Sequence, residues 1–230
     1  MLRGGGMLSI HGRGHKKMLL VHGWSGWIGQ FESLFAEVDP DEYTVYAVHP
    51  LGHGESSSEQ SHPGRFIEAV LDAHDYVGKP FDVGIGHSLG AAALVYVEAM
   101  DPCFRRLVLV SGPATIEGVL DRFARFVNLG GRSKQLFLQG MEATVGLAVD
   151  RLDLLALATS IQKPALLVHD DSDREVPVEE ARRLNQAFPN SCLVQTTGYG
   201  HSRILQQPGV IRDILAFARD TAVRQRNLQA

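Results

Sequence analysis

The amino-acid sequence predicts an α/β protein, with a mostly parallel sheet and helices on both of its faces. Three observations lead to this prediction. First, short β-rich apolar runs alternate along the chain with stretches of helical spacing, and glycine-containing turns lie between them. Second, these runs are mostly apolar rather than alternating, which is typical of strands buried on both faces. Third, a chain of 230 residues can bury a full hydrophobic core, so we expect one domain over residues 1–230.

Six apolar runs are predicted to be the buried strands: 18–22, 44–49, 81–85, 106–110, 165–169 and 193–197. Five segments of helical spacing lie between or after them: 30–38, 63–77, 89–100, 178–188 and 209–217. Because strand and helix follow each other, right-handed crossovers and parallel pairing are expected. Residues 7–10 are predicted to add an edge strand, and the glycine-rich residues before it are expected to be disordered.

One segment interrupts this alternation. About fifty residues, 113–163, pass with helix-like spacing before the next strand begins. Two helices are predicted there, the second of them over 136–148. The first carries five apolar residues on one face: Val119, Leu120, Phe123, Phe126 and Val127. Two interpretations stay open, since the helices can pack on the edge of the sheet or form a cap over a pocket.

Composition and charge exclude several classes of function. The chain has 22 basic and 26 acidic residues, a formal net charge of −4, and they are scattered, so we expect no binding to nucleic acid. Only two cysteines, Cys103 and Cys192, are present, which excludes a disulfide framework and a thiolate metal cage. The apolar runs are far shorter than the roughly 20 residues that span a bilayer. Residues 1–17 lack the apolar stretch of a secretory signal, so a cytoplasmic location is expected.

The first motif with chemical content is Gly86-His87-Ser88-Leu89-Gly90, where a predicted strand meets a predicted helix. It matches the G-x-S-x-G nucleophile elbow, in which serine lies on a strained turn and flanking glycines leave room for it. The helix N-terminus then directs its dipole and free N–H groups toward negative charge that develops near Ser88. The alternative is that Ser88 caps the helix. A dinucleotide-binding fingerprint is excluded, because it requires glycine where Leu89 stands.

A serine hydroxyl needs a base within hydrogen-bond reach and an acid that orients this base. Among ten histidines, His201 is the best candidate, because it follows the last strand in a glycine-flanked turn. Asp170, Asp171 and Asp173 compete for the acid, and the chain order Ser, Asp, His selects their segment without choosing among them. A solvated acidic turn is the alternative. Three further histidines are expected to be surface or core residues: His62, His74 and His169.

Together these motifs resemble the α/β-hydrolase superfamily, in its serine-nucleophile esterase and lipase branch, over residues 18–217. Asp173-x-x-Val176-Pro177 resembles the acid motif of that family, which selects Asp173 among the three aspartates. Gly200-His201 is similar to the histidine turn of the family. The resemblance therefore implies an α/β-hydrolase fold with a catalytic triad of Ser88, Asp173 and His201.

The same resemblance implies an oxyanion hole. His22-Gly23-Trp24 looks like the family's His-Gly-x turn, in which the residue after the glycine donates a backbone N–H. On that match, the two donors are the backbone N–H groups of Trp24 and Leu89. Gly52-His53-Gly54-Glu55-Ser56 is similar to the Gly-x-Gly-x-Ser loop of the family, and the insertion at about 113–163 falls where the family carries its cap.

Two residues depart from the pattern of the family. His49 stands where many relatives carry aspartate ahead of the Gly-x-Gly loop. Asp170 stands where glycine is common ahead of the acid. Neither departure changes the implied triad, and both affect only the local conformation of the loops.

The resemblance implies a serine hydrolase that cleaves a carboxylic ester or thioester of a small or medium apolar acyl substrate through an acyl-enzyme. A carbon–carbon bond hydrolase or an acyltransferase uses the same three residues, and a ligand-binding signalling protein with little turnover also stays open. Serine rather than aspartate at the nucleophile position disfavours the haloalkane dehalogenase and epoxide hydrolase branches. No metal or organic cofactor is implied, and the expected partner is the small-molecule substrate.

Overall fold

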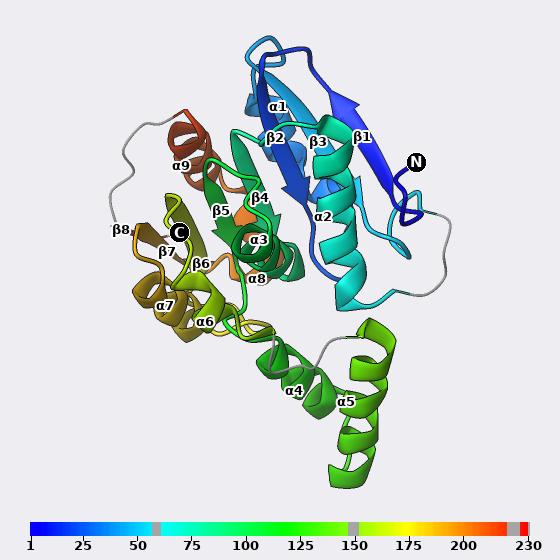
Figure 1. Cartoon of the computed structure of the whole chain (residues 1–230). Helices are drawn as coiled ribbons and strands as arrows, with labels where there is room; N and C mark the ends of the chain where they lie inside the picture. The colour runs from blue at the N-terminus through cyan, green and yellow to red at the C-terminus, as the bar shows by residue number, and fades with distance from the viewer. Residues whose placement is uncertain (57–60, 147–151, 220–225, 230) are drawn as a thin grey trace.

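The computed structural model describes residues 1–56, 61–146, 152–219 and 226–229 of the chain. The strands in these ranges form one sheet in the order β1-β3-β2-β4-β5-β6-β7-β8 (Figure 1). β1 runs antiparallel to β3, and the other neighbours are parallel. The predicted fold class is therefore confirmed. The strands are β1 (Met7–His11), β2 (Lys16–Val21), β3 (Tyr43–His49), β4 (Val83–His87), β5 (Leu107–Val110), β6 (Ala165–Asp170), β7 (Ser191–Thr197) and β8 (Arg226–Gln229).

The helices follow the predicted order. α2 and α3 occupy the predicted residues, and α2 begins with Pro63 and ends before Gly78, whose φ of 64° stops the helix. The helix predicted at 30–38 divides into a 3-10 turn and a short α-helix. The helical elements are η1 (Ile28–Phe31), α1 (Glu32–Glu37), α2 (Pro63–Val77), α3 (Leu89–Met100), α4 (Ile116–Phe126), α5 (Gly131–Val145), α6 (Leu154–Ala158), α7 (Val178–Ala187), α8 (Gly200–Arg203), η3 (Ile204–Gln206) and α9 (Pro208–Ala218).

β4 begins and ends two residues later than predicted. Phe81 forms only an isolated bridge with Phe104, whereas His87 pairs with Val110 of β5. Because β4 extends to His87, the next residue, Ser88, lies directly at the carboxyl edge of the sheet.

The glycine-rich residues before β1 are packed, so the predicted disorder is wrong. Leu2 is buried in a hydrophobic core, and the Gly4 N–H donates a hydrogen bond of 2.6 Å to the Asp72 carboxylate of α2. Contacts with α2 therefore outweigh the conformational freedom of these glycines.

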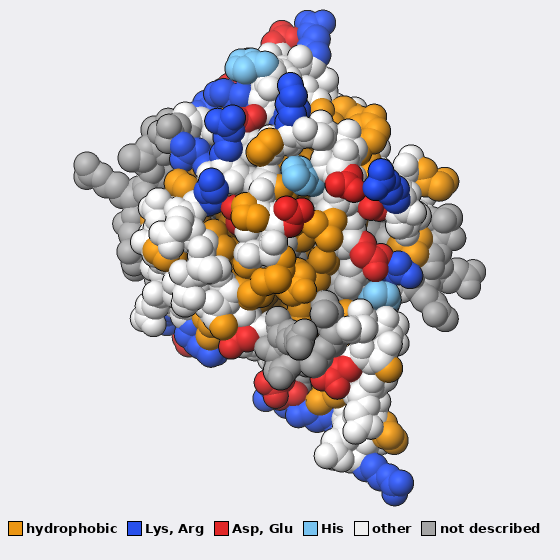
Figure 2. Space-filling model, viewed as in Figure 1, with side chains coloured by type: hydrophobic (Ala, Val, Ile, Leu, Met, Phe, Trp, Pro, Cys, Tyr) orange, Lys and Arg blue, Asp and Glu red, His pale blue; other side chains and the backbone are white. Residues whose placement is uncertain are grey.

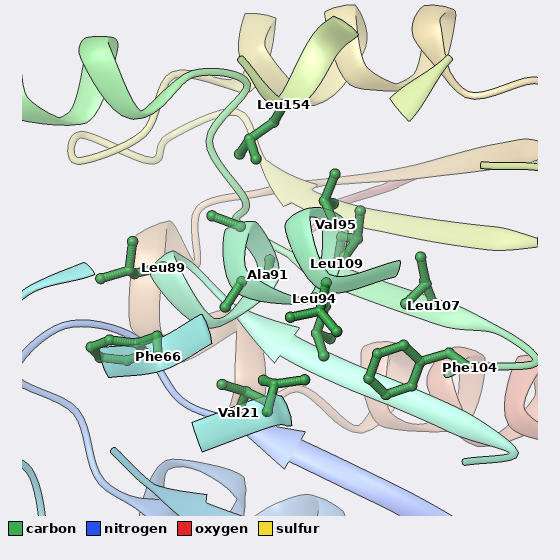
Figure 3. Close-up of a cluster of buried hydrophobic side chains, with 14 of the residues drawn as sticks. Val21, Phe66, Leu89, Ala91, Leu94, Val95, Phe104, Leu107, Leu109 and Leu154 are labelled. Atoms are coloured by element: carbon green, nitrogen blue, oxygen red, sulfur yellow. The ribbon is translucent and has the colours of Figure 1, made fainter. Parts of the chain in front are cut away.

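Successive side chains of the inner strands enter two hydrophobic cores, one on each face of the sheet. In β2, Leu19 and Val21 face the core under α2, α3, α6 and α7, while Met18 and Leu20 face the core under α1 and α9. This period of two follows from the pleat of a strand buried on both sides. Each fully buried aliphatic side chain contributes roughly 1.5–3 kcal/mol. Figure 3 shows part of the first core, where α3 packs against β5 and α6: Leu94, Val95, Leu107, Leu109 and Leu154.

The insertion forms α4, α5 and α6. α6 packs on α3 and α7, whereas α4 and α5, together called the helical arm here, extend beyond the sheet instead of lying along its edge (Figure 1). α5 ends at Val145, and positions 147 and 148 of the predicted second helix lie outside the described residues.

The apolar face predicted for the first helix is only partly buried. Leu120 is buried, but Phe126 is 87% exposed, and Phe123 packs on Phe137 of α5 with ring centroids 5.5 Å apart. Figure 2 shows hydrophobic side chains at the surface of the arm. No side chain of α5 is buried. The apolar spacing therefore predicted the helix correctly but did not tell which surface its face would meet.

Candidate active site

The turn after β4 has the geometry of a nucleophile elbow. Ser88 has φ 53° and ψ −119°, a strained conformation for a residue with a side chain. A Cβ on Gly86 would lie 2.6 Å from the backbone nitrogen of Ala91, and one on Gly90 would overlap the carbonyl oxygen of Val21. Only glycine fits at either position. The Ser88 hydroxyl makes no capping hydrogen bond to α3, so the helix-cap alternative does not describe this turn.

His201 and Asp173 meet at the same edge of the sheet. His201 lies in α8, and its Nδ1 is 2.7 Å from Asp173 Oδ2. The other carboxylate oxygen, Oδ1, accepts hydrogen bonds of 2.9 Å from the backbone N–H groups of Glu175 and Val176. Because a carboxylate only accepts hydrogen bonds, His201 carries its proton on Nδ1, which leaves Nε2 free to act as a base.

Asp173 is buried, and it remains ionised. Burial by itself raises the pKa of its carboxyl, but hydrogen bonds from His169 and His201 outweigh this and hold the pKa well below its usual value. His169 Nε2 donates to the carbonyl oxygen of Val176 at 2.8 Å and lies 3.3 Å from Asp173 Oδ2. The carboxylate therefore carries a full negative charge beside the imidazole of His201.

The other two aspartates of this segment have different environments. Asp170 is fully buried and accepts four hydrogen bonds, from the Thr196 hydroxyl and from the backbone N–H groups of Ser172, Tyr199 and Gly200. Although burial raises its pKa, these bonds produce a net lowering. Asp171 is exposed and accepts from the Thr197 hydroxyl. Asp170 thus fixes the turn that precedes His201, and only Asp173 contacts the His201 ring.

No hydrogen bond joins the Ser88 hydroxyl to the His201 ring in the described structure. His87 connects them: its Nε2 lies 2.9 Å from the carbonyl oxygen of His201, and the two rings are 4.8 Å apart. In ligand-free enzymes, catalytic hydrogen bonds are often long and shorten only when substrate binds.

The loop after β2 brings a second backbone segment against Ser88. A Cβ on Gly23 would lie 2.9 Å from Ser88 Cβ, so this loop passes directly beside the serine. Within the described ranges, no hydrogen bond uses the backbone N–H of Trp24 or of Leu89. These two N–H groups, predicted to form the oxyanion hole, therefore keep their donor capacity.

A hydrogen bond joins the same loop to the Gly-x-Gly segment. The Ser25 N–H donates to His53 Nε2 at 3.1 Å, and Ser25 itself has a positive φ of 55°. The Trp24 side chain, 49% exposed, lies against His53 and Phe66. Trp27, later in the loop, is also exposed.

An apolar hollow begins at Leu89, next to the serine. This hollow is shallow and open to solvent, and a second open hollow continues it toward α5. Figure 2 shows hydrophobic side chains gathered between α2 and α3 on this face. The first hollow is lined by Pro63, Ile67, Leu89, Ala92, Ala93, Ile116, Leu152 and Leu154. The second shares Pro63, Ile116 and Leu152 and adds Leu120, Met141, Glu142 and Val145.

Three buried histidines at the site were not assigned to it from the sequence. His53 contacts the loop after β2, His87 the backbone of His201, and His169 the Asp173 carboxylate. His169 was expected to be a surface or core residue, and it is in the core. The one local signal in the sequence that links His169 with Asp173 is their spacing of four residues across the end of a strand.

Within the described ranges, no group of three histidine, cysteine or acidic side chains is arranged to hold a metal ion. No described helix is long and apolar enough to cross a membrane. The cytoplasmic location stays a prediction.

Comparisons with known proteins show what this chain is similar to. The esterase for pimeloyl-[acyl-carrier protein] methyl ester of Xanthomonas campestris is 22% identical over 240 residues, 86% of this chain and 92% of that protein. A monoacylglycerol lipase of Mycolicibacterium smegmatis is 22% identical over 205 residues, 73% of each chain. Among solved structures, the monoacylglycerol lipase of Paleococcus ferrophilus superimposes with a TM-score of 0.74 at 17% identity, over 94% of this chain and 99% of its own.

A thermophilic esterase from Thermogutta terrifontis gives a TM-score of 0.70 at 19% identity, over 94% of this chain and 93% of its own. At these identities the solved structures establish the shared fold alone. The family model described as alpha/beta hydrolase family matches residues 18–214. Because this match covers most of the chain, the protein belongs to the alpha/beta hydrolase family and is a hydrolase.

Proposed function

We propose that the protein is a serine hydrolase that cleaves a carboxylic ester or thioester through an acyl-enzyme. The observation that carries this proposal is the hydrogen bond of 2.7 Å between His201 Nδ1 and Asp173 Oδ2, at the same edge of the sheet as the strained turn of Ser88. The relatives named as a methyl ester esterase and a monoacylglycerol lipase support an ester as the bond that is cleaved.

In the proposed reaction, Ser88 Oγ attacks the carbonyl carbon of the substrate while His201 Nε2 accepts its proton. Asp173 stays ionised and stabilises the imidazolium that forms. The tetrahedral intermediate collapses when His201 returns the proton to the departing alcohol or thiol, which leaves the acyl group on Ser88. A water molecule, deprotonated by His201, then attacks the acyl carbon. The bond between Ser88 Oγ and the acyl carbon breaks, His201 returns the proton to Ser88 Oγ, and the carboxylic acid is released.

The backbone N–H groups of Trp24 and Leu89 hold the negative oxygen of both tetrahedral intermediates. Loss of one such donor typically raises the barrier by roughly 3 kcal/mol. Leu89 begins α3, a helix of 12 residues, so the positive end of the helix dipole adds to this stabilisation.

We infer that the acyl group enters the two apolar hollows next to Leu89. Their lining is apolar except for Glu142 at the far end, which suits a small or medium uncharged acyl chain. In this proposal, residues 1–230 form one domain in which the insertion at about 113–163 is the cap, since Ile116 and Leu120 of α4 and Met141 of α5 line the hollows.

Hydrolysis of p-nitrophenyl esters of increasing acyl length by the purified full chain tests the proposal. We expect Ser88→Ala to lower kcat by at least roughly 10³-fold, and a fluorophosphonate probe to label wild type at Ser88 in one-to-one ratio. Ser160→Ala, which changes an exposed serine of the α6 region, serves as the matched control and keeps full activity. Equal activity of Ser88→Ala and wild type would overturn the assignment.

A further inference from the structure

His87 is placed between the two halves of the candidate site. It is the last residue of β4, only 2% exposed, and its Nε2 lies 2.9 Å from the carbonyl oxygen of His201. This contact joins residues that are 114 positions apart. The carbonyl oxygen has a second, longer contact at 3.4 Å, with the Ser111 hydroxyl.

We propose that His87 is a positioning residue, which donates its Nε2–H to the carbonyl oxygen of His201 and thereby holds the imidazole of His201 over Ser88. The inference rests on the proposed function, because it assigns to His87 the placement of the base in that reaction.

The turn that carries His201 needs such an anchor. Gly198 and Gly200 both have positive φ, 89° and 70°, and α8 has only four residues. Asp170 holds the beginning of this turn through the N–H groups of Tyr199 and Gly200. His87 contacts the carbonyl oxygen of the peptide between His201 and Ser202, so hydrogen bonds hold the backbone both before and after His201.

The side-chain bond to Asp173 does not replace this backbone anchor. It fixes Nδ1 of the His201 ring, but the ring can pivot about that bond if the backbone shifts. Displacement of a reacting group by about 1 Å can cost on the order of 100-fold in rate. A fixed Cα together with the Asp173 bond restricts where Nε2 can lie. In this structure Nε2 lies 3.8 Å from Oε2 of the exposed Glu175 side chain.

The surroundings of His87 keep it a neutral donor. Its pKa is lowered to about 3, mainly by burial and also by the nearby imidazoles of His201 and His22, against the His201 carbonyl bond and the Asp173 charge, which raise it. A neutral imidazole has one N–H, and the carbonyl oxygen requires it on Nε2. Nδ1 has no partner in the described structure and faces Gly23, where a Cβ would be 3.2 Å away. His87 is therefore not a competing base.

Three substitutions distinguish the role of the His87 N–H donor from the role of the ring volume. His87→Phe keeps the ring and removes the donor. His87→Gln carries an amide N–H at about the reach of Nε2, and His87→Asn has the same amide one bond shorter, too short for the His201 carbonyl. We expect kcat to fall by roughly 10- to 100-fold in the Phe and Asn variants, with KM within about threefold. His87→Gln should recover most of kcat and of the rate of fluorophosphonate labelling.

Folding is monitored by far-UV circular dichroism, and the Gln and Asn variants remain decisive if His87→Phe does not fold. Wild-type kcat and labelling rate in folded Asn or Phe variants would overturn the inference, as would a folded Gln variant no better than Asn. A wild-type protein that neither labels nor turns over any ester would refute the proposed function itself, which is a different outcome.

Discussion

The turns that carry the candidate acid and base are held differently from the helical arm. In the turns, residues 170–176 and 198–201, two buried carboxylates accept hydrogen bonds from five backbone N–H groups. The arm is attached through an apolar stripe of α4 and an ion pair between Arg122 and Glu180, and no side chain of α5 is buried.

The hydrogen bonds of the turns and the apolar contacts of the arm suit two different tasks. Hydrogen bonds are directional and fix atoms within tenths of an ångström, as proton transfer requires. Apolar contacts have no preferred direction and adapt to different partners. In the proposed function the turns therefore carry out the chemistry and the arm selects the acyl group, and four experiments test this division.

The largest effect is expected for Asp173→Asn. The amide can donate toward Nδ1 of His201 and favour the wrong tautomer, which lowers kcat by about 10⁴-fold. Asp171→Asn makes the same change in an exposed side chain of the same turn and should keep kcat within twofold. Steady-state kinetics on one p-nitrophenyl ester measures both, and similar kcat values in the two variants would contradict the assignment of the acid.

The next effect concerns stability. Asp170→Ala leaves the Thr196 hydroxyl and the N–H groups of Tyr199 and Gly200 without their acceptor in a buried turn. We expect the free energy of unfolding to fall by about 3 kcal/mol, measured by urea denaturation followed by circular dichroism. Asp171→Ala is the control, with a change below about 0.5 kcal/mol. If Asp170→Ala lowers the free energy of unfolding by less than about 1 kcal/mol, the turn is stable without this carboxylate.

The buried histidines make stability depend on pH. Burial lowers the pKa of His22 from 6.5 to about 4, and it lowers the pKa of His87 to about 3. Between pH 6.5 and 4 the unfolded chain binds more protons than the folded one, so stability is full above this window and is lost as pH falls through it.

From pH 7 to pH 5, each of these two histidines should cost the folded state about 1–2 kcal/mol. Urea denaturation at both pH values measures the loss of unfolding free energy. In His87→Gln this loss should be smaller by the contribution of one histidine. Asp173 does not contribute in this range, because its carboxyl titrates from 3.8 downward. An equal loss in wild type and His87→Gln would contradict the neutral state of His87.

The smallest effect on stability is expected in the arm. Met141 lines the second hollow, whereas Leu136, on the same helix, is exposed. We expect Met141→Ser and Leu136→Ser to change the free energy of unfolding by less than about 0.5 kcal/mol. Met141→Ser alone should alter the ranking of kcat/KM across acyl lengths, by severalfold. A change of ranking in Leu136→Ser as well would place the substrate elsewhere on the arm.

The sequence predicted those parts of the molecule that depend on local pattern. The strands follow from apolar runs that both cores bury, and the elbow follows from glycines at 86 and 90 that no Cβ could replace. The family resemblance selected Asp173 over its two neighbours, and Asp173 is the aspartate that contacts His201.

The contacts that the sequence did not predict arise from tertiary placement. His87 meets the backbone of His201 only because β4 continues to His87 beside β5. Asp170 was expected to affect the loop conformation alone, and the four hydrogen bonds that give it this role come from residues 172–200. The direction of the helical arm was likewise open, because an apolar stripe does not specify its partner.

The loop after β2 has one further consequence for work in solution. The chain contains two tryptophans, Trp24 and Trp27, and both are exposed in this loop. Intrinsic emission excited at the indole band therefore reports on the entrance to the site rather than on either core. Quenching or a spectral shift on addition of an ester analogue would give its affinity without labelling, while the same signal would follow the opening of this loop before the sheet itself unfolds.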